Sequence, residues 1–379
     1  MSAAKRVLVA GGGTGGHVYP ALAIIDELRR SDPETRVCYV GTRRGLEARL
    51  LRDRPDVAFR PIRIEGLPRR RPLAALRSLG LLVVSMLQTL WVLMTFRPQL
   101  VLGVGGHSSF SPVFLSALLG RLLPIRTVIH EQNVVGGLAN RILSRLVDVV
   151  MVSFEESRRS FPHARRVAVT GNPIREELLH AKKDAAAYRL FGLDPERRTI
   201  LVFGGSKGSS EMTEQIRAGQ ADIAEHTELQ VLLVTGDQER TRVLREEMRR
   251  SGAANVVVET YVERMGEALA IADLVVCRAG ATSLAEITAC GKASVLVPWP
   301  GATDDHQRAN ARVIRDEGAC TMAEEEALSR GELVRLIREL AGDEDELGRL
   351  ARNARRHGRP DACRAILGEL RWVMGEVRG

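Results

Sequence analysis

A glycine-rich turn near the N-terminus constrains this chain more than any other feature. The string GGGTGGH at residues 11–17 follows a short apolar run at residues 7–10, and a helical pattern begins directly afterwards over residues 17–30. Glycines allow a sharp turn, and they let a phosphate approach backbone N–H groups at the positive end of a helix. The stretch therefore predicts a strand, a phosphate-binding turn and a helix.

The glycine spacing leaves more than one ligand open. Gly11, Gly13 and Gly16 fit the dinucleotide fingerprint, which would favour a nicotinamide or flavin cofactor. The next predicted strand, residues 36–40, ends in Gly-Thr-Arg-Arg and lacks the acid that holds a ribose. Its arginines would suit NADP instead, and a turn that only lets a helix pack close to a strand is a further alternative.

Composition limits the class of protein. A length of 379 residues suits two domains, and 45% hydrophobic with 27% charged residues is typical of a globular chain. The net charge of +8 predicts an acidic partner, but an aromatic content of 4% and the absence of zinc-finger or RNP patterns argue against nucleic acid. Five widely spaced cysteines favour reduced thiols in the cytosol, and the first strand begins too early for a signal peptide.

The first half alternates strands and helices. Apolar runs at residues 100–104, 126–130, 149–153 and 167–170 predict a doubly wound parallel sheet, whereas residues 52–72 look basic and loop-like. Glu131 and Asn133 follow one of these strands and are site candidates, since ligands bind at the carboxyl ends of parallel strands. Their alternative role is to cap the next helix and satisfy the turn.

The same pattern restarts at residue 199. A strand at residues 200–203 runs into a second glycine turn at residues 204–209, and further strands are predicted at residues 231–235, 256–259, 274–277 and 294–298. Lys207 lacks the spacing of a P-loop lysine. Two similar α/β domains facing one another across a cleft would accommodate a substrate with two ends.

Two later stretches suit a sugar nucleotide. Residues 278–286 form a turn that opens into a helix, whose N-terminus can face a diphosphate while Glu286 accepts hydrogen bonds from a ribose diol. Ser283 and Glu286 also have the spacing of a capping box, and the two interpretations remain equal. Residues 299–310 carry amides and carboxylates suited to sugar hydroxyls, and no metal site is expected there because adjacent ligands rarely converge.

Residues 78–96 contain no charged side chain and are just long enough to cross a membrane. Serine, threonine and glutamine interrupt the run, and it lies between successive strands of one predicted sheet, so a helix of the domain is favoured over a span. Arginines 69, 70, 71 and 77 lie beside it. Either a core helix or an apolar patch on an anionic membrane surface fits.

Six strings in order carry a family resemblance. They are GGGTGGH at 11–17, HEQN at 130–133, TGNPIR at 170–175, GGS at 204–206, CRAGATSLAE at 277–286 and DHQ at 305–307. The chain resembles glycosyltransferase family 28, in the branch of bacterial N-acetylglucosaminyltransferases that convert lipid I to lipid II. The departures are Lys207, where relatives often have glutamine, and the turn at residues 107–112, where a tyrosine and a shorter path to proline would be usual.

The resemblance implies the two-domain GT-B fold, with residues 1–172 as an acceptor and membrane-facing domain, residues 173–355 as a donor domain, and a helix at about 356–379 packed back on the first domain. It implies UDP-N-acetylglucosamine as donor, undecaprenyl-linked lipid I as acceptor, a β-1,4 linkage formed with inversion, and no cofactor or tightly held metal. It also implies a peripheral position on the cytoplasmic membrane face through Arg69 to Phe96, where other cell-wall synthesis proteins could be partners.

The resemblance also assigns site residues. Glu286 falls on the ribose hydroxyls and Val262 on the uracil, and the remaining substrate-binding positions are Thr14, Gly15, Gly16, Asn133, Arg175, Ser206, Ala281, Thr282, Ser283, Leu284, Ala285, Gln307 and Asn310. His17 is the candidate general base, because a sugar hydroxyl must lose a proton and a helix N-terminus favours neutral imidazole. Glu131 is the alternative base or the residue that orients it.

Three rival functions stay open. Another GT-B transferase could use UDP-glucose or UDP-glucuronate. An NADP-dependent reductase would leave the second glycine turn without a role. A non-catalytic nucleotide-binding protein at the membrane would bind the donor without turning it over.

Overall fold

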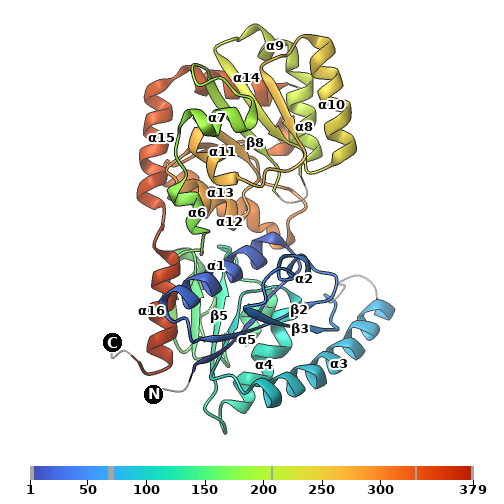
Figure 1. Ribbon diagram of the computed structural model, residues 1–379, viewed down its shortest axis with the longest axis vertical. Helices are drawn as coiled ribbons and strands as arrows, with labels where there is room; N and C mark the ends of the chain where they lie inside the picture. The colour runs from blue at the N-terminus through green and yellow to red at the C-terminus, as the bar shows by residue number, and fades with distance from the viewer. Residues whose placement is uncertain (1–3, 67–71, 206–207, 329–330, 377–379) are drawn as a thin grey trace. The chain divides into compact units, whose positions relative to one another are not determined.

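The computed structural model describes residues 4–66, 72–205, 208–328 and 331–376. The chain forms two compact units, Met1–Ile174 with Asp361–Gly379, and Arg175–Pro360. Each unit is a parallel sheet covered by helices (Figure 1).

Over the described residues, unit 1 has a seven-stranded sheet with the order β3-β2-β1-β4-β5-β6-β7. All neighbouring strands are parallel. The strands are β1 Arg6–Ala10, β2 Arg36–Thr42, β3 Val57–Ile62, β4 Leu100–Gly103, β5 Arg126–Glu131, β6 Val149–Val152 and β7 Val167–Val169. Because β2 and β3 extend to one side of β1, and β4 to β7 to the other, the topological switch point lies between β1 and β4.

Apolar β-branched runs form this sheet because both of its faces are buried. Val7, Val9 and Leu102 pack with α1 (Gly15–Ser31) and α16 (Ala362–Val373) on one face. Leu8, Val101 and their neighbours pack on the other face. That face is covered by α3 (Pro72–Phe96), α4 (Phe110–Leu119) and α5 (Leu138–Leu143) (Figure 1). The short α2 (Leu46–Leu50) follows β2.

The loop expected over residues 52–72 is wrong for one segment. Val57–Ile62 forms β3, which pairs with β2 at the edge of the sheet. Only its two end residues are buried, so the segment lacks the continuous apolar pattern of the central strands. Pro61 is tolerated because edge strands need fewer ladder hydrogen bonds.

The final helix, α16, packs on unit 1 beside α1. Arg166 donates to both carboxylate oxygens of Glu369 at 3.0 and 2.9 Å, and its guanidinium lies 4.3 Å from the ring centroid of Trp372. These contacts link the loop before β7 to the last helix of the chain.

Unit 2 has, in its described part, a six-stranded parallel sheet with the order β10-β9-β8-β11-β12-β13. The strands are β8 Arg198–Phe203, β9 Leu229–Val234, β10 Val256–Glu259, β11 Leu274–Cys277, β12 Ala293–Leu296 and β13 Thr321–Met322. Its helices are α6 Glu176–His180, α7 Ala185–Phe191, α8 Ser210–Ala218, α9 Gln220–Glu225, α10 Gln238–Ser251, α11 Met265–Ile271, α12 Ala281–Ala289, α13 His306–Asp316, α14 Glu332–Gly342 and α15 Glu344–His357. The switch point lies between β8 and β11.

Candidate functional site

The glycine-rich turn of unit 1 lies at the switch point, where ligands bind in open parallel sheets. It follows β1, and a second turn at Gly105 and Gly106 follows the neighbouring β4. The two turns touch through backbone, because a Cβ added to Gly106 would lie 2.2 Å from the Gly12 carbonyl oxygen. Thr14 is exposed and is the N-cap of α1, with no side-chain cap hydrogen bond.

Gly15, Gly16 and His17 form the first turn of α1. Gly15 is buried, whereas Gly16 and His17 are partly exposed. The His17 Nδ1 atom lies 3.1 Å from Oε1 of Gln132, at the end of β5. The helix N-terminus and the end of β5 thus bring an imidazole to the expected binding edge.

Glu47 binds the backbone of the glycine turn. Its carboxylate is fully buried and accepts from the backbone N–H of Thr42 at 2.7 Å and of Gly13 at 3.4 Å. The Thr42 hydroxyl donates to the same carboxylate oxygen at 2.8 Å. A buried carboxylate with several donors fixes the backbone around it.

Glu131 binds the turn and the helix that follow β5, which is the structural alternative given for it above. Its Oε1 accepts from the backbone and side-chain amides of Asn133 at 3.0 and 3.2 Å. Its Oε2 accepts from Gly137 N at 2.9 Å and Asn140 Nδ2 at 2.8 Å. A buried carboxylate that already has four donors is poorly placed to take a proton from a substrate, which favours His17 as the base.

In unit 2 the second glycine turn follows β8 at that unit's switch point. Ser206, which the sequence predicts as a donor contact, and Lys207 lie outside the described residues. Arg278, at the end of β11, reaches this turn by donating to Ser209 Oγ at 2.7 Å and also pairs with Glu325. Its guanidinium is buried and holds the ends of neighbouring strands together.

Helix α12 follows β11 and carries the predicted uridine-binding segment. It begins at Ala281 with Gly280 as N-cap and no side-chain cap, so the capping-box alternative for Ser283 and Glu286 is wrong. Glycine at the cap leaves the helix N-terminus without a side chain over it. Of the other assigned positions, Ala281 and Leu284 are buried, and Thr282, Ser283 and Ala285 are partly exposed.

Glu286 lies on α12, one turn into the helix. Its carboxylate is mostly buried and lies 3.4 Å from Nη2 of Arg175, the residue before α6. Burial raises the pKa of Glu286 above its usual value, and the guanidinium of Arg175 opposes that shift. Two of the predicted donor-binding residues therefore meet directly.

Three further predicted positions line the carboxyl side of this sheet. Val262 is buried in the loop after β10, behind the exposed Tyr261. Gln307, in the first turn of α13, accepts from the backbone N–H of Trp299 at 3.0 Å. Asn310 is fully buried and donates to the Ala279 carbonyl at 3.1 Å, so here it supports the turn before α12.

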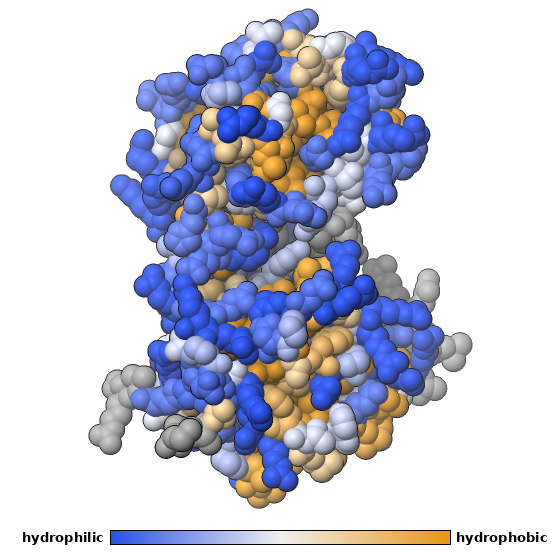
Figure 2. All heavy atoms as spheres, in the orientation of Figure 1, coloured by the Kyte–Doolittle hydropathy of each residue, from blue (hydrophilic) through white to orange (hydrophobic). Residues whose placement is uncertain are grey.

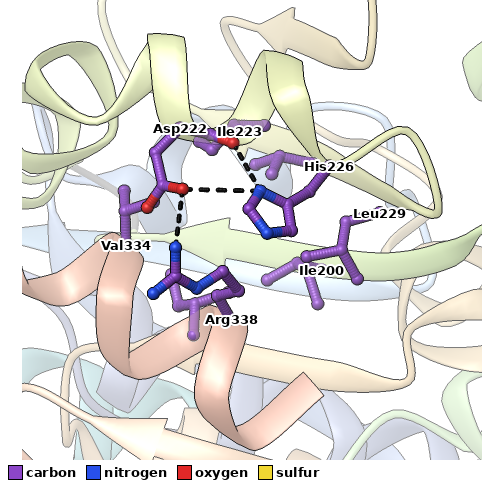
Figure 3. A pocket seen from close by; sticks show the side chains of 9 residues that line it. Ile200, Asp222, Ile223, His226, Leu229, Val334 and Arg338 are labelled. Atoms are coloured by element: carbon purple, nitrogen blue, oxygen red, sulfur yellow. Dashed lines mark hydrogen bonds and ion pairs between the residues drawn. The ribbon is translucent and has the colours of Figure 1, made fainter. Parts of the chain in front are cut away.

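A further cluster of polar residues lies in unit 2, on α9 and α14. In the described part of the chain, no three His, Cys, Asp or Glu residues are arranged to hold a metal ion. Asp222 joins α9 to Arg338 of α14, and His226 lies beside it (Figure 3). The adjoining cavity of about 10 Å³ has room for roughly one water molecule, which is too small for a substrate. We therefore assign this cluster a structural role, in which it holds α9 against α14 beside β8 and β9.

Helix α3 presents an unusual surface. Its small polar residues Ser78, Ser85 and Thr89 are buried, and Ser85 Oγ lies 2.6 Å from Ser111 Oγ of α4. Six of its large hydrophobic residues are exposed, whereas Val92 and Leu93 are buried in the core. The exposed six are Leu79, Val83, Val84, Leu87, Trp91 and Met94, which we call the α3 face. In Figure 2 hydrophobic atoms gather over this part of unit 1. By length and composition alone, residues 77–96 could cross a membrane, and 22% of the most apolar stretch in this segment is buried.

Sequence reasoning missed Gln132, Glu47 and Arg278. Gln132 stands in a string that was noticed, but only the structure shows that its side chain reaches His17. Glu47 stands in none of the six strings, and Arg278 stands in the string at residues 277–286 but had no predicted role. Their burial, at 0% and 8% exposure, is the signal, and it emerges only from the fold.

Comparison with known proteins gives two family matches. Residues 7–152 match the glycosyltransferase family 28 N-terminal domain. Residues 199–366 match the glycosyltransferase family 28 C-terminal domain.

Two relatives carry the name UDP-N-acetylglucosamine--N-acetylmuramyl-(pentapeptide) pyrophosphoryl-undecaprenol N-acetylglucosamine transferase. The protein from Lactiplantibacillus plantarum is 38% identical over 369 residues, covering 97% of this chain and 99% of that protein. The protein from Geotalea daltonii is 39% identical over 373 residues, covering 96% and 97%.

Solved structures agree. MurG from Acinetobacter baumannii has a TM-score of 0.72 and 29% identity, covering 97% of this chain and 99% of that one. CalG4, the calicheamicin glycosyltransferase, has a TM-score of 0.69 at 16% identity and covers all of both chains, which is a likeness of fold alone.

Proposed function

This chain belongs to glycosyltransferase family 28, as its motifs predict, and we propose that it transfers N-acetylglucosamine from UDP-N-acetylglucosamine to lipid I, giving lipid II for peptidoglycan synthesis. Its two parallel-sheet units have the GT-B fold. The observation that supports the proposal is that some of the predicted site residues of each unit lie at that unit's switch point. His17 lies at one, and Glu286 with Arg175 lies at the other.

Unit 2 is proposed to bind the donor. Glu286 accepts hydrogen bonds from the ribose hydroxyls, and the backbone around Val262 meets the uracil. The uncapped N-terminus of α12 and the turn after β8 face the diphosphate, whose charge is favoured by a helix N-terminus. Gln307 contacts the donor sugar from α13. The donor is a substrate, and no cofactor is part of the proposed reaction.

Unit 1 is proposed to bind the acceptor and supply the base. His17 takes the proton from the C4 hydroxyl of the muramoyl sugar while that oxygen bonds to the anomeric carbon. The bond from the anomeric carbon to the phosphate oxygen breaks at the same time, and UDP leaves with the electron pair. Attack opposite the leaving group inverts the centre and gives the β-1,4 linkage.

The test is transfer of radiolabelled N-acetylglucosamine from its UDP conjugate to a short-chain lipid I analogue, with UDP-glucose as competing donor. The wild type is expected to form the disaccharide product and to prefer UDP-N-acetylglucosamine. His17→Ala is expected to lose about 100-fold or more in kcat while still binding UDP. A folded wild type that binds UDP but transfers nothing to lipid I would contradict the acceptor assignment.

We also propose that unit 1 lies on the cytoplasmic surface of the membrane through the α3 face. On α3 small polar residues are buried while the hydrophobic residues of the α3 face are exposed, which departs from the usual pattern of a helix on a globular domain. Arg77 and Arg97, which flank the uncharged residues 78–96, are exposed and suit an anionic headgroup layer. Helix α4 packs along α3, and the exposed Leu122 and Leu123 follow it.

Vesicle sedimentation tests this surface. Leu87→Asp with Trp91→Asp is expected to abolish binding to vesicles that contain anionic lipid. The control is Leu190→Asp, which alters an exposed leucine of unit 2 and is expected to leave binding unchanged. High salt is expected to release part of the protein, whereas release by detergent alone would mean that apolar insertion outweighs charge. Equal binding by the α3 variant and the control would contradict the proposal.

A further inference from the structure

A chain of buried hydrogen bonds leads from the core of unit 1 to the imidazole of His17. Gln132 donates through Nε2 to the Val104 carbonyl at 3.0 Å and lies 3.0 Å from Nδ1 of His130. His130 Nε2 lies 2.9 Å from the Gly171 carbonyl. His130 is fully buried and Gln132 is 2% exposed, so water does not compete for these bonds.

Carbonyl oxygens fix the direction of every bond in this chain, because they only accept. The end of the Gln132 amide that faces the Val104 carbonyl must be its NH2 group. The Gly171 carbonyl requires the proton of His130 on Nε2, which leaves Nδ1 of that ring to accept from Gln132. Both requirements give the amide of Gln132 the same orientation.

That orientation decides the tautomer of His17. The Gln132 oxygen is the atom that faces His17 Nδ1, at 3.1 Å, so Nδ1 must carry the proton. In a neutral imidazole the lone pair then resides on Nε2. The His17 ring packs directly against Gly105, because a Cβ at that position would lie only 2.7 Å from His17 Nδ1.

We infer that Gln132, held by Val104 and His130, is a positioning residue that keeps the basic lone pair of His17 on Nε2. This inference rests on the proposed function, in which that nitrogen takes the proton of the acceptor hydroxyl. Gln132 itself touches no reacting atom. It acts as the neutral counterpart of a carboxylate that orients a catalytic histidine, and it does so without adding a charge to the buried network.

The first test is nitrogen-15 NMR of the histidine rings in the perdeuterated full chain at about pH 8, above the ordinary pKa of imidazole. The signals of His17 are assigned by their loss in His17→Gln. The expected result is a protonated Nδ1 and an unprotonated Nε2 in the wild type. A wild-type His17 protonated on Nε2 would overturn the inference, and this outcome does not depend on whether the protein transfers any sugar.

The second test compares Gln132→Leu with Gln230→Leu. Gln230 is a matched control in unit 2, because it is 3% exposed and donates to Asp194 O at 2.7 Å and Thr199 Oγ1 at 2.9 Å. Loss of Gln132 is expected to lower kcat by about tenfold to a thousandfold, with the KM for the donor changed by less than about twofold. Gln230→Leu is expected to lose comparable stability but to keep kcat.

A third variant separates positioning from packing. Gln132→Glu retains an oxygen that accepts from His17 Nδ1 and is expected to recover part of the kcat lost in Gln132→Leu, with the wild-type tautomer signals. Equal kcat for Gln132→Leu and Gln230→Leu, with unchanged His17 signals, would overturn the inference. If wild type transfers nothing to lipid I, the proposed function fails, and the NMR result still decides the tautomer. If Gln132→Leu does not fold, the wild-type spectrum decides.

Discussion

Arg175 and Glu286 form an ion pair within unit 2, with Nη2 and Oε1 3.4 Å apart. The same guanidinium reaches Glu177 through Nη1 at 3.1 Å. The two carboxylates differ in environment, because the Glu286 side chain is 10% exposed and that of Glu177 is 69% exposed. Arg175 thus holds one carboxylate in the proposed ribose site and another in solvent.

Glu286→Gln is expected to weaken UDP binding by about tenfold to a hundredfold, because an amide replaces an ionised acceptor of two ribose hydroxyls. The control Glu177→Gln removes a solvent-exposed partner of the same arginine and is expected to change affinity by less than about twofold. Isothermal titration with UDP measures both. Similar losses in the two variants would mean that Arg175, and not the Glu286 carboxylate, carries the affinity.

His130 is expected to make unit 1 sensitive to acid. Burial lowers its pKa to about 4, against a value of 6.5 for the free side chain. Between these values the unfolded chain binds more protons than the folded one, so stability falls as the pH is lowered from about 6.5 to about 4, by on the order of 3 kcal/mol.

Urea unfolding across this pH range tests the prediction. His130→Gln, which can still donate to the Gly171 carbonyl, is expected to show a shallower loss than wild type. His180→Gln changes an imidazole that is 72% exposed and serves as the control. Equal acid sensitivity in wild type and His130→Gln would assign the loss to other groups.

Glu47→Ala is expected to destabilise unit 1 by about 2 to 4 kcal/mol, because it removes a fully buried acceptor that three donors of Thr42 and Gly13 share. The glycine turn loses its support, so transfer is expected to fall while UDP affinity is retained. Glu155→Ala, which breaks an exposed pair with Arg158, is expected to cost less than about 1 kcal/mol. Urea unfolding and the transfer assay measure the two effects.

Sequence reasoning found the parts of the fold that depend on local pattern. Continuous apolar runs predicted the central strands of both sheets, and glycines marked both switch-point turns. It missed β3, because only the two end residues of this edge strand are buried and the strand has no continuous apolar run. It noticed polar residues on the helix at residues 78–96 but could not say that they face inwards, since the choice depends on partners such as Ser111, 26 residues away.

The site residues likewise fall into those that sequence motifs predicted and those that only the fold reveals. His17 and Glu286 stand in recognisable strings, and their residue types suit the proposed chemistry. The role of Gln132 depends on a carbonyl 28 residues earlier and on a histidine 115 residues earlier, which meet only after β1, β4 and β5 pair. Long-range hydrogen bonds of this kind leave no periodic trace in a sequence.

Gly106→Ala is expected to disrupt the paired turns at the switch point of unit 1. Gly106 has a φ of 78°, and an added Cβ would lie 2.2 Å from the Gly12 carbonyl oxygen, which is backbone and cannot rotate away. The free energy of unfolding is expected to fall by more than about 2 kcal/mol. Transfer is expected to be lost, whereas UDP binding in unit 2 is expected to be affected less.

The matched control is Gly80→Ala in α3, where no atom lies within 4 Å of an added Cβ. Alanine favours a helix more than glycine does, so this variant is expected to be more stable by about 0.5 to 1 kcal/mol. Urea unfolding and the transfer assay compare the two. If Gly106→Ala unfolds at the same urea concentration as wild type and retains transfer, the two turns do not need the backbone contact between Gly106 and Gly12.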